Sequence, residues 1–153
     1  MNGYPKGFFP LLMATTVLIF VSGLLLIPSF LSFRMQFDHA WVDWLMTLPI
    51  THGALRVTIT SLHVFLGWAM IWFIGSLWTI HMRTHWRRNE NRASGLSFMV
   101  FWIILILSGL AIFYVSHEDL SQFSSLLHVL LGLAMPIALY IHRRKGKKSL
   151  QPS

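Results

Sequence analysis

Residues 61–70 read SLHVFLGWAM, and residues 126–135 read LLHVLLGLAM. The two stretches share Leu-His-Val, a glycine four residues after the histidine, and an Ala-Met pair at the same offset. A second pair of similar stretches precedes them in the same order, LIFVSGLLLI at 18–27 and LILSGLAIF at 105–113. Each lies in an apolar run long enough to cross roughly 30 Å of hydrocarbon, which takes about 20 helical residues. These repeats predict a duplicated two-helix hairpin that spans a membrane.

Four apolar spans follow from this length criterion, at about residues 8–33, 54–80, 96–115 and 123–141. Backbone polar groups in lipid must be satisfied within their own segment, so each span is predicted to be a helix. The expected fold is an all-α bundle of four transmembrane helices. It forms a single membrane domain over residues 1–153, in which 142–153 is a basic cytoplasmic tail.

The composition of the 153-residue chain agrees with a membrane location. Hydrophobic residues make up 55% of the chain and charged residues only 11%, whereas a soluble domain carries about a quarter charged residues. This excludes a disordered tail and a soluble α/β enzyme. The sequence contains no cysteine, which excludes a disulfide-stapled module, a thiolate-held Fe–S cluster and a covalently tethered c-type haem.

The net charge of +7 is explained by where the basic residues lie. Ten of the twelve Lys and Arg residues fall near the two termini or in the loop at 82–94, and four of the five acidic residues fall in the loops at 34–51 and 116–121. By the positive-inside rule, both termini and the loop at 82–94 are expected in the cytoplasm, with the chain in a bacterial inner membrane. The basic surplus is therefore a topology signal, and nucleic-acid binding is not expected.

The strongest candidates for a functional site are His63 and His128, each about two turns inside its span among apolar residues. An ionisable side chain at this depth is costly and faces the bundle interior with a partner. Two histidines at equivalent repeat positions predict a shared ligand rather than two separate structural hydrogen bonds. Gly67 and Gly132, one turn further along the same faces, offer surface without Cβ atoms to a flat macrocycle. Imidazoles from facing helices can supply both axial ligands of a haem iron, so haem b is the expected cofactor.

Arg56 and two Ser-Gly pairs lie near these histidines, and the sequence allows two interpretations of each. Arg56 precedes His63 by seven residues and so lies on the same face, about 10 Å nearer the start of the helix. It suits a haem propionate, and it equally suits an interfacial arginine that extends toward the headgroups. The Ser-Gly pairs at 22–23 and 108–109 either let the first and third helices approach the ring or serve ordinary small-residue helix packing.

A second haem is predicted near the cytoplasmic ends of the same helices. His142 follows His128 by fourteen residues and His81 follows His63 by eighteen, so both return to the faces already used. The two rises differ by about 6 Å, which helix tilt or a kink must absorb. The alternative is that His81, His85 and His142 are interfacial residues beside a basic loop.

With four helices, the motifs LHVFLG and LHVLLG, and the spacing His128-x13-His142, the chain resembles the small b-type cytochrome membrane subunits. These include the haem-b subunits of formate dehydrogenase and Ni–Fe hydrogenase and related four-helix bacterial cytochromes. The resemblance implies that two b haems carry electrons between the quinone pool and a partner redox protein, such as a c-type cytochrome or an Fe–S or molybdenum protein. It implies that His63 and His128 ligate the outer haem and His142 the inner one. Some of these subunits take an inner ligand from the first helix, which here has no histidine, so His81 or His85 would have to fill that place.

The sequence also leaves other functions open. It has no dinucleotide fingerprint and no nucleophile motif, so we expect an electron-transfer subunit rather than an enzyme that acts alone. Met70 and Met135 follow His63 and His128 by seven residues each, and His with Met suits copper binding or transport. The same methionines suit gap-filling in a core, and no acidic residue lies in any span. A haem-free membrane anchor is the third alternative.

Overall fold

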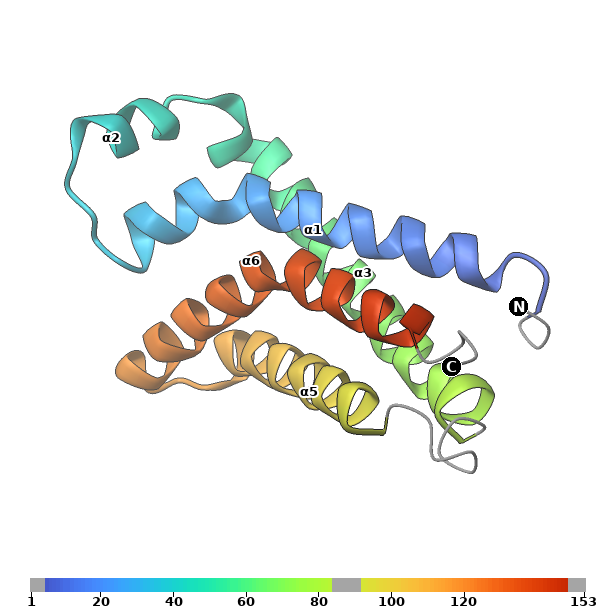
Figure 1. The fold of residues 1–153 in the computed structure, drawn as a ribbon. Helices are drawn as coiled ribbons and strands as arrows, with labels where there is room; N and C mark the ends of the chain where they lie inside the picture. Colours follow the sequence, from blue (N-terminus) through green and yellow to red (C-terminus); the bar gives the residue numbers. More distant parts are fainter. Residues whose placement is uncertain (1–4, 84–91, 149–153) are drawn as a thin grey trace.

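The computed structural model describes residues 5–83 and 92–148, and these parts are helical without any strand. Four of the helices are long and apolar enough to cross a membrane, which confirms the predicted all-α, four-helix fold (Figure 1). Their bounds are α1 (Phe8–Phe33), α3 (Gly53–Leu77), α5 (Arg92–Tyr114) and α6 (Glu118–Lys148).

The four long helices form two hairpins. Helix α1 packs along α3, α5 packs along α6, and α1 also contacts α6, which joins the two halves. In Figure 1 the start of α1 and the end of α6 lie at one end of the molecule, which we call the terminal end. The short helix α2 (Ala40–Met46) lies at the opposite end, which we call the α2 end. The predicted duplication is therefore visible in the packing.

The ends of the helices depart from the hydropathy-based bounds. Helix α6 starts at Glu118 instead of near 123 and runs to Lys148 instead of 141. Its first turn holds Glu118 and Asp119, and acidic side chains there and basic side chains near the last turn both interact favourably with the helix dipole. The first part of the predicted basic tail is thus helix. Helix α5 starts at Arg92 instead of 96, and α3 continues beyond Leu77 into a π-helical turn, η2 (Trp78–Met82).

The loop between α1 and α3 is structured, which the sequence did not predict. It contains α2 and the 3₁₀ turn η1 (Pro49–Thr51). Val42 and Thr51 are almost completely buried, and the Thr51 hydroxyl donates to the backbone carbonyls of Leu48 and Met46. A seven-residue helix is too short to give a clear periodic pattern in the sequence.

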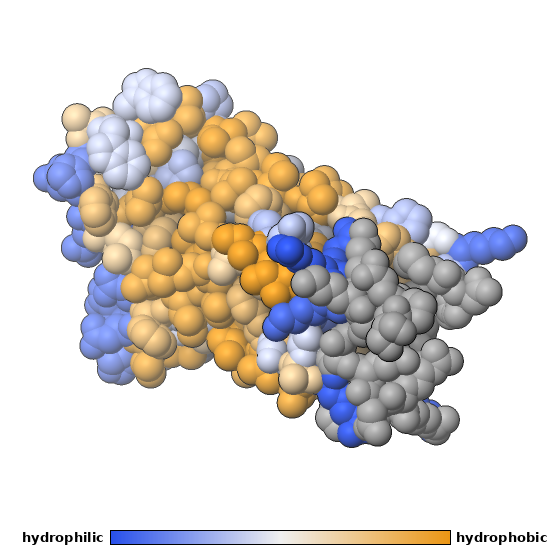
Figure 2. Space-filling view, in the orientation of Figure 1, coloured by the Kyte–Doolittle hydropathy of each residue, from blue (hydrophilic) through white to orange (hydrophobic). Residues whose placement is uncertain are grey.

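The lateral surface of the bundle is apolar. Figure 2 shows a hydrophobic belt across this face, with hydrophilic residues gathered toward the two ends. Large apolar side chains such as Phe65, Trp72 and Ile137 are more than half exposed. A continuous apolar surface of this kind is typical of contact with membrane lipid.

Candidate functional site

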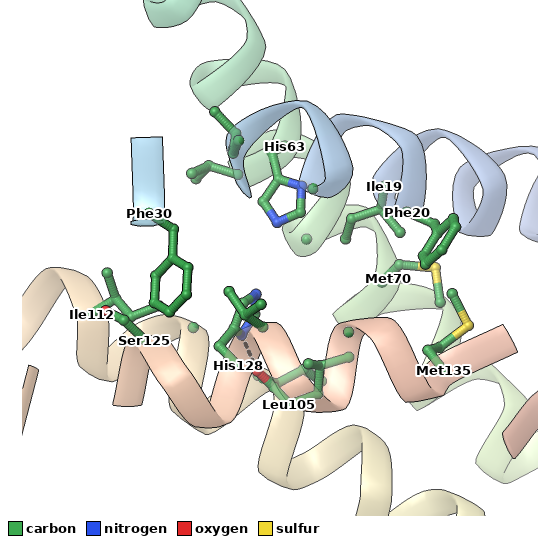
Figure 3. A pocket seen from close by; sticks show the side chains of 18 of the residues that line it. Ile19, Phe20, Phe30, His63, Met70, Leu105, Ile112, Ser125, His128 and Met135 are labelled. Carbon is green, nitrogen blue, oxygen red and sulfur yellow. Dashed lines mark hydrogen bonds between the residues drawn. The ribbon is translucent and has the colours of Figure 1, made fainter. Parts of the chain in front are cut away.

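A cavity of about 330 Å³ lies inside the bundle, and all four long helices contribute to its lining. It extends from Met70 and Met135 toward Phe30 and Arg34, which lies at the C-terminal end of α1 near the α2 end (Figure 3). Most of the lining side chains are apolar. A volume of this size falls in the range of roughly 300–1,000 Å³ that small-molecule and cofactor sites occupy.

His63 of α3 and His128 of α6 face one another across this cavity (Figure 3). Each lies ten residues after the first residue of its helix, so the repeat places both at the same depth. The ring centroids are 6.1 Å apart, and the ring planes cross at 82°. The structure therefore brings together the two histidines that the sequence predicted to share a ligand.

The hydrogen bonds of His128 define which ring nitrogen carries the proton. Its Nδ1 lies 3.0 Å from the carbonyl oxygen of Leu105 and 3.2 Å from the hydroxyl of Ser108. A carbonyl oxygen only accepts, so the neutral ring holds its proton on Nδ1 and leaves a lone pair on Nε2. Metal-binding histidines are commonly fixed in this way, by a carbonyl on the nitrogen that does not bind the metal.

His63 has a matching arrangement with the first hairpin. Its Nδ1 lies 2.9 Å from the hydroxyl of Ser22, and this hydroxyl donates its proton to the carbonyl of Ile19 at 3.0 Å. The serine oxygen therefore accepts from Nδ1–H, which again leaves Nε2 with a free lone pair. Within the described residues, no hydrogen bond is found at Nε2 of either His63 or His128.

The glycine of each Ser-Gly pair makes room for the imidazole. A Cβ atom added to Gly23 would lie 3.1 Å from Cε1 of His63, and one added to Gly109 would lie 2.9 Å from Cε1 of His128. Any larger residue at these places would push against the ring. The two Ser-Gly pairs thus position the histidines through hydrogen bonds and close approach, in addition to serving helix packing.

Gly67 and Gly132 also line the cavity, but unlike Gly23 and Gly109 they face open space within the part of the chain that the structure describes. A Cβ atom added to either would have no neighbour within 4 Å. A glycine in a helix interior lowers the stability of the helix by about 1 kcal/mol relative to alanine. Close packing against another helix does not explain the glycine at either of these two positions. Both positions leave free space beside the histidine pair for a bound molecule.

These residues fit a haem. Two imidazole nitrogens bound at about 2 Å on opposite sides of one metal ion put the ring centroids roughly 6 Å apart, close to the 6.1 Å between His63 and His128. The Nδ1 contacts hold both rings in the tautomer that such ligation needs. Gly67 and Gly132 supply open backbone surface on α3 and α6, where a flat ring would lie.

Of the two arginines near this end of the bundle, Arg34 lines the cavity and Arg56 does not. Arg56 is not among the cavity-lining residues, and its guanidinium lies over the ring of Phe33, 4.6 Å from the centroid. Arg34 does line the cavity, and its Nη1 donates to the hydroxyl of Ser121 at 2.9 Å. Sequence reasoning missed Arg34 because the spacing within one helix cannot show how the end of α1 meets α6.

The predicted second site is only partly described. His142 does not line the cavity; its ring stacks on Phe98 with centroids 4.7 Å apart, and its Nδ1 is 3.3 Å from the hydroxyl of Ser94. The backbone of His81 lies in η2, but its side chain, like the whole of His85, is outside the described residues. The inner pair of ligands therefore stays a prediction.

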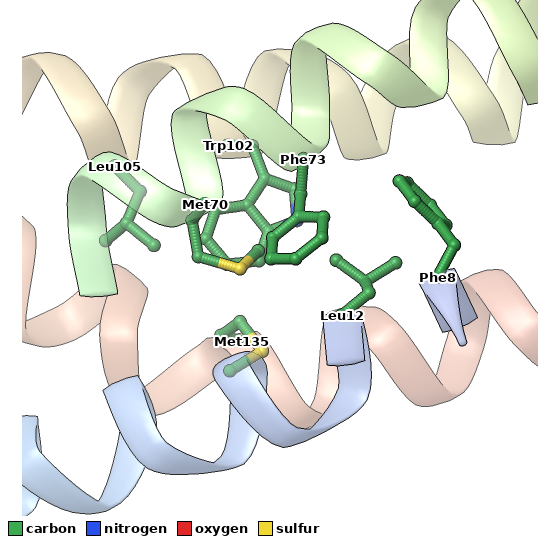
Figure 4. Packing of buried hydrophobic residues seen from close by; sticks show 7 residues of the cluster. All are labelled: Phe8, Leu12, Met70, Phe73, Trp102, Leu105 and Met135. Carbon is green, nitrogen blue, oxygen red and sulfur yellow. The ribbon is translucent and has the colours of Figure 1, made fainter. Parts of the chain in front are cut away.

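Met70 and Met135 line the same cavity and also belong to the main buried cluster (Figure 4). Both are almost fully buried, and the sulfur of Met70 is 3.9 Å from the hydroxyl of Thr16. The cluster takes residues from all four long helices: Phe8, Leu12, Met70, Phe73, Trp102, Leu105 and Met135. The methionines thus fill the core between the hairpins as well as bordering the site.

Comparisons with protein-family models, curated proteins and solved structures give no match to this chain. In the structure, two imidazoles with oriented lone pairs face one another across an apolar cavity inside four membrane-length helices.

Proposed function

We propose that this protein is a haem b-binding membrane subunit that passes electrons between the quinone pool and a partner redox protein. The observation that carries the proposal is the facing pair of His63 and His128, at equal depth in the two hairpins, with ring centroids 6.1 Å apart. Haem b, when bound, supplies one-electron exchange at its iron.

The chain's own residues favour electron transfer over chemistry on a substrate. His63 and His128 would both hold the iron of a bound haem, which would leave it to exchange electrons and not to bind a substrate or oxygen. The lining of the cavity is mostly apolar, and burial and nearby charge help to set the reduction potential of a bound haem. Any chemistry on a substrate then belongs to the partner protein.

The proposal includes a direction across the membrane. If both termini are cytoplasmic, in a bacterial inner membrane, the His63–His128 site lies toward the outer face, since it is nearer the α2 end. A partner such as a c-type cytochrome or an Fe–S or molybdenum protein would exchange electrons there. A second haem between His142 and His81 or His85 would extend the path toward the cytoplasm.

Haem content of purified variants tests the proposal. The protein is made under haem-replete conditions as wild type, His63→Ala, His128→Ala and, as a control, His117→Ala, whose side chain is exposed near the start of α6. Pyridine haemochrome and reduced-minus-oxidised spectra should show b haem in the wild type and the control, and one haem fewer per chain in each site variant. Circular dichroism verifies that the variants stay helical. A wild-type protein without haem contradicts the proposal.

Copper binding is the second candidate, because Met70, Met135, His63 and His128 all line one cavity. Imidazole and thioether ligands together suit copper. The open backbone at Gly67 and Gly132 favours haem over it, since a single ion needs no flat surface. Metal analysis of the same purified protein separates the two: iron equal to the haem content supports the cytochrome, whereas copper without haem supports the alternative.

A further inference from the structure

Arg34 joins the two hairpins at the mouth of the cavity near the α2 end. It follows the last residue of α1, and its Nη1 donates to the hydroxyl of Ser121 in α6 at 2.9 Å. Its backbone carbonyl accepts from the side-chain amide of Gln122 at 2.8 Å. The guanidinium is therefore held in place from the first turns of α6, and the side chain is half-buried against the cavity.

The guanidinium has no carboxylate partner among residues 5–83 and 92–148. The acidic residues of the described segments, Asp38, Asp43, Glu118 and Asp119, form no ion pair with it, and the bond to Ser121 uses one of its five N–H donors. A guanidinium beside apolar lining is costly unless it is paired. Arg34 thus presents unpaired donors next to the space where a ligand would lie.

The position of Arg34 relative to the histidines sets the size of that ligand. Ser121 precedes His128 by seven residues, two turns of α6, so the two side chains share a face about 10 Å apart along the axis. Ser125, between them on that face, also lines the cavity. A carboxylate on a short flexible arm at the edge of a ring held between the histidines spans this distance.

We propose that Arg34 binds a carboxylate of the molecule held between His63 and His128, and so fixes its acidic edge toward the α2 end. This inference rests on the proposed function, and it assigns to Arg34 the role that the sequence suggested for Arg56. The chemical class of ligand is a flat porphyrin that carries free carboxylates. Arginine is suited to this task because its planar fork matches a carboxylate with two parallel hydrogen bonds.

Binding of two porphyrins that differ only in whether their carboxylates are free or methylated tests the inference. The detergent-purified protein, made under haem-limiting conditions, is titrated with ferric protoporphyrin IX and with its dimethyl ester, whose carboxylates are blocked. Soret absorbance reports binding for the wild type, Arg34→Gln, Arg34→Lys and the matched control Arg56→Gln. We expect the wild type and Arg56→Gln to prefer the free acid by about ten- to a hundredfold.

Arg34→Gln should lose this preference while its affinity for the ester stays unchanged, and Arg34→Lys should keep part of it. The unchanged ester affinity also demonstrates that the site is still folded. A preference retained in Arg34→Gln, or lost in Arg56→Gln, overturns the role of Arg34 and leaves the haem site intact. Binding of neither porphyrin to the wild type overturns both this inference and the proposed function.

Discussion

At the scale of the residue, Ser22 and Ser108 hold equivalent places in the two hairpins but do not support their histidines equally. The nearest partner of His63 Nδ1 is the hydroxyl of Ser22, at 2.9 Å, and the backbone carbonyl of Ile19 also interacts with this ring. His128 has both the hydroxyl of Ser108, at 3.2 Å, and a backbone carbonyl at 3.0 Å. Removal of the serine should therefore matter more for His63 than for His128.

We predict that Ser22→Ala lowers haem affinity about tenfold or more, because partners on the outer nitrogen of a metal-binding histidine typically contribute 10–100-fold. It should also raise the midpoint potential, because an imidazole without that partner donates less electron density to the metal. Ser108→Ala should have a smaller effect on both. Haem titration and redox titration measure both quantities. The control is Ser29→Ala, because the buried hydroxyl of Ser29 has no hydrogen-bond partner among the described residues. A larger effect of Ser108→Ala would contradict this assignment.

Within the helices, Gly23 and Gly109 pack closely against the histidines, whereas Gly67 and Gly132 face open space and should tolerate a larger side chain in the empty protein. We predict that Gly132→Leu abolishes haem binding while the helical fold stays at least as stable, because a Cβ there meets no protein atom and leucine favours helix by about 1 kcal/mol over glycine. Gly75→Leu, also in open space but outside the cavity lining, is the control and should bind haem normally. Thermal unfolding and haem content are measured together. Haem bound normally by Gly132→Leu would show that the ligand does not lie against α6.

The sequence predicted the elements better than their ends and contacts. Hydropathy located α1 at its observed bounds, since that span contains no charged residue. It placed the ends of α6 too far inward, because charged residues can continue a helix beyond the hydrocarbon. The repeat was enough to predict the histidine pair. The Ser-Gly pairs could also be recognised in the sequence, but the sequence alone did not decide between their two possible roles. Arg34 was not predictable as a cavity residue, because its place depends on how two hairpins dock.

At the scale of the whole molecule, the question is whether the path for electrons crosses the entire membrane. The buried cluster in Figure 4 fills the bundle on the terminal side of the cavity, and His142 lies further toward that end, stacked on Phe98. To ligate a second haem, the His142 ring must leave Phe98 and meet His81 or His85.

We predict two b haems per chain in the wild type, one of which is lost in His142→Ala while the haem at His63 and His128 remains. Pyridine haemochrome per chain measures the number, and stepwise redox titration identifies which haem is missing. Phe98→Leu serves as the matched control, since it removes the stacking partner but no ligand. A wild type with a single haem that His142→Ala does not change would restrict electron transfer to one side of the bundle.

The electron paramagnetic resonance spectrum of the oxidised protein tests directly whether His63 and His128 together ligate one haem iron. Two axial imidazoles predict a low-spin ferric signal, and ring planes that cross at 82° predict a strongly anisotropic one. His128→Ala should convert this signal to high-spin or remove it. A high-spin signal in the wild type, or none from protein made with ample haem, would contradict the account.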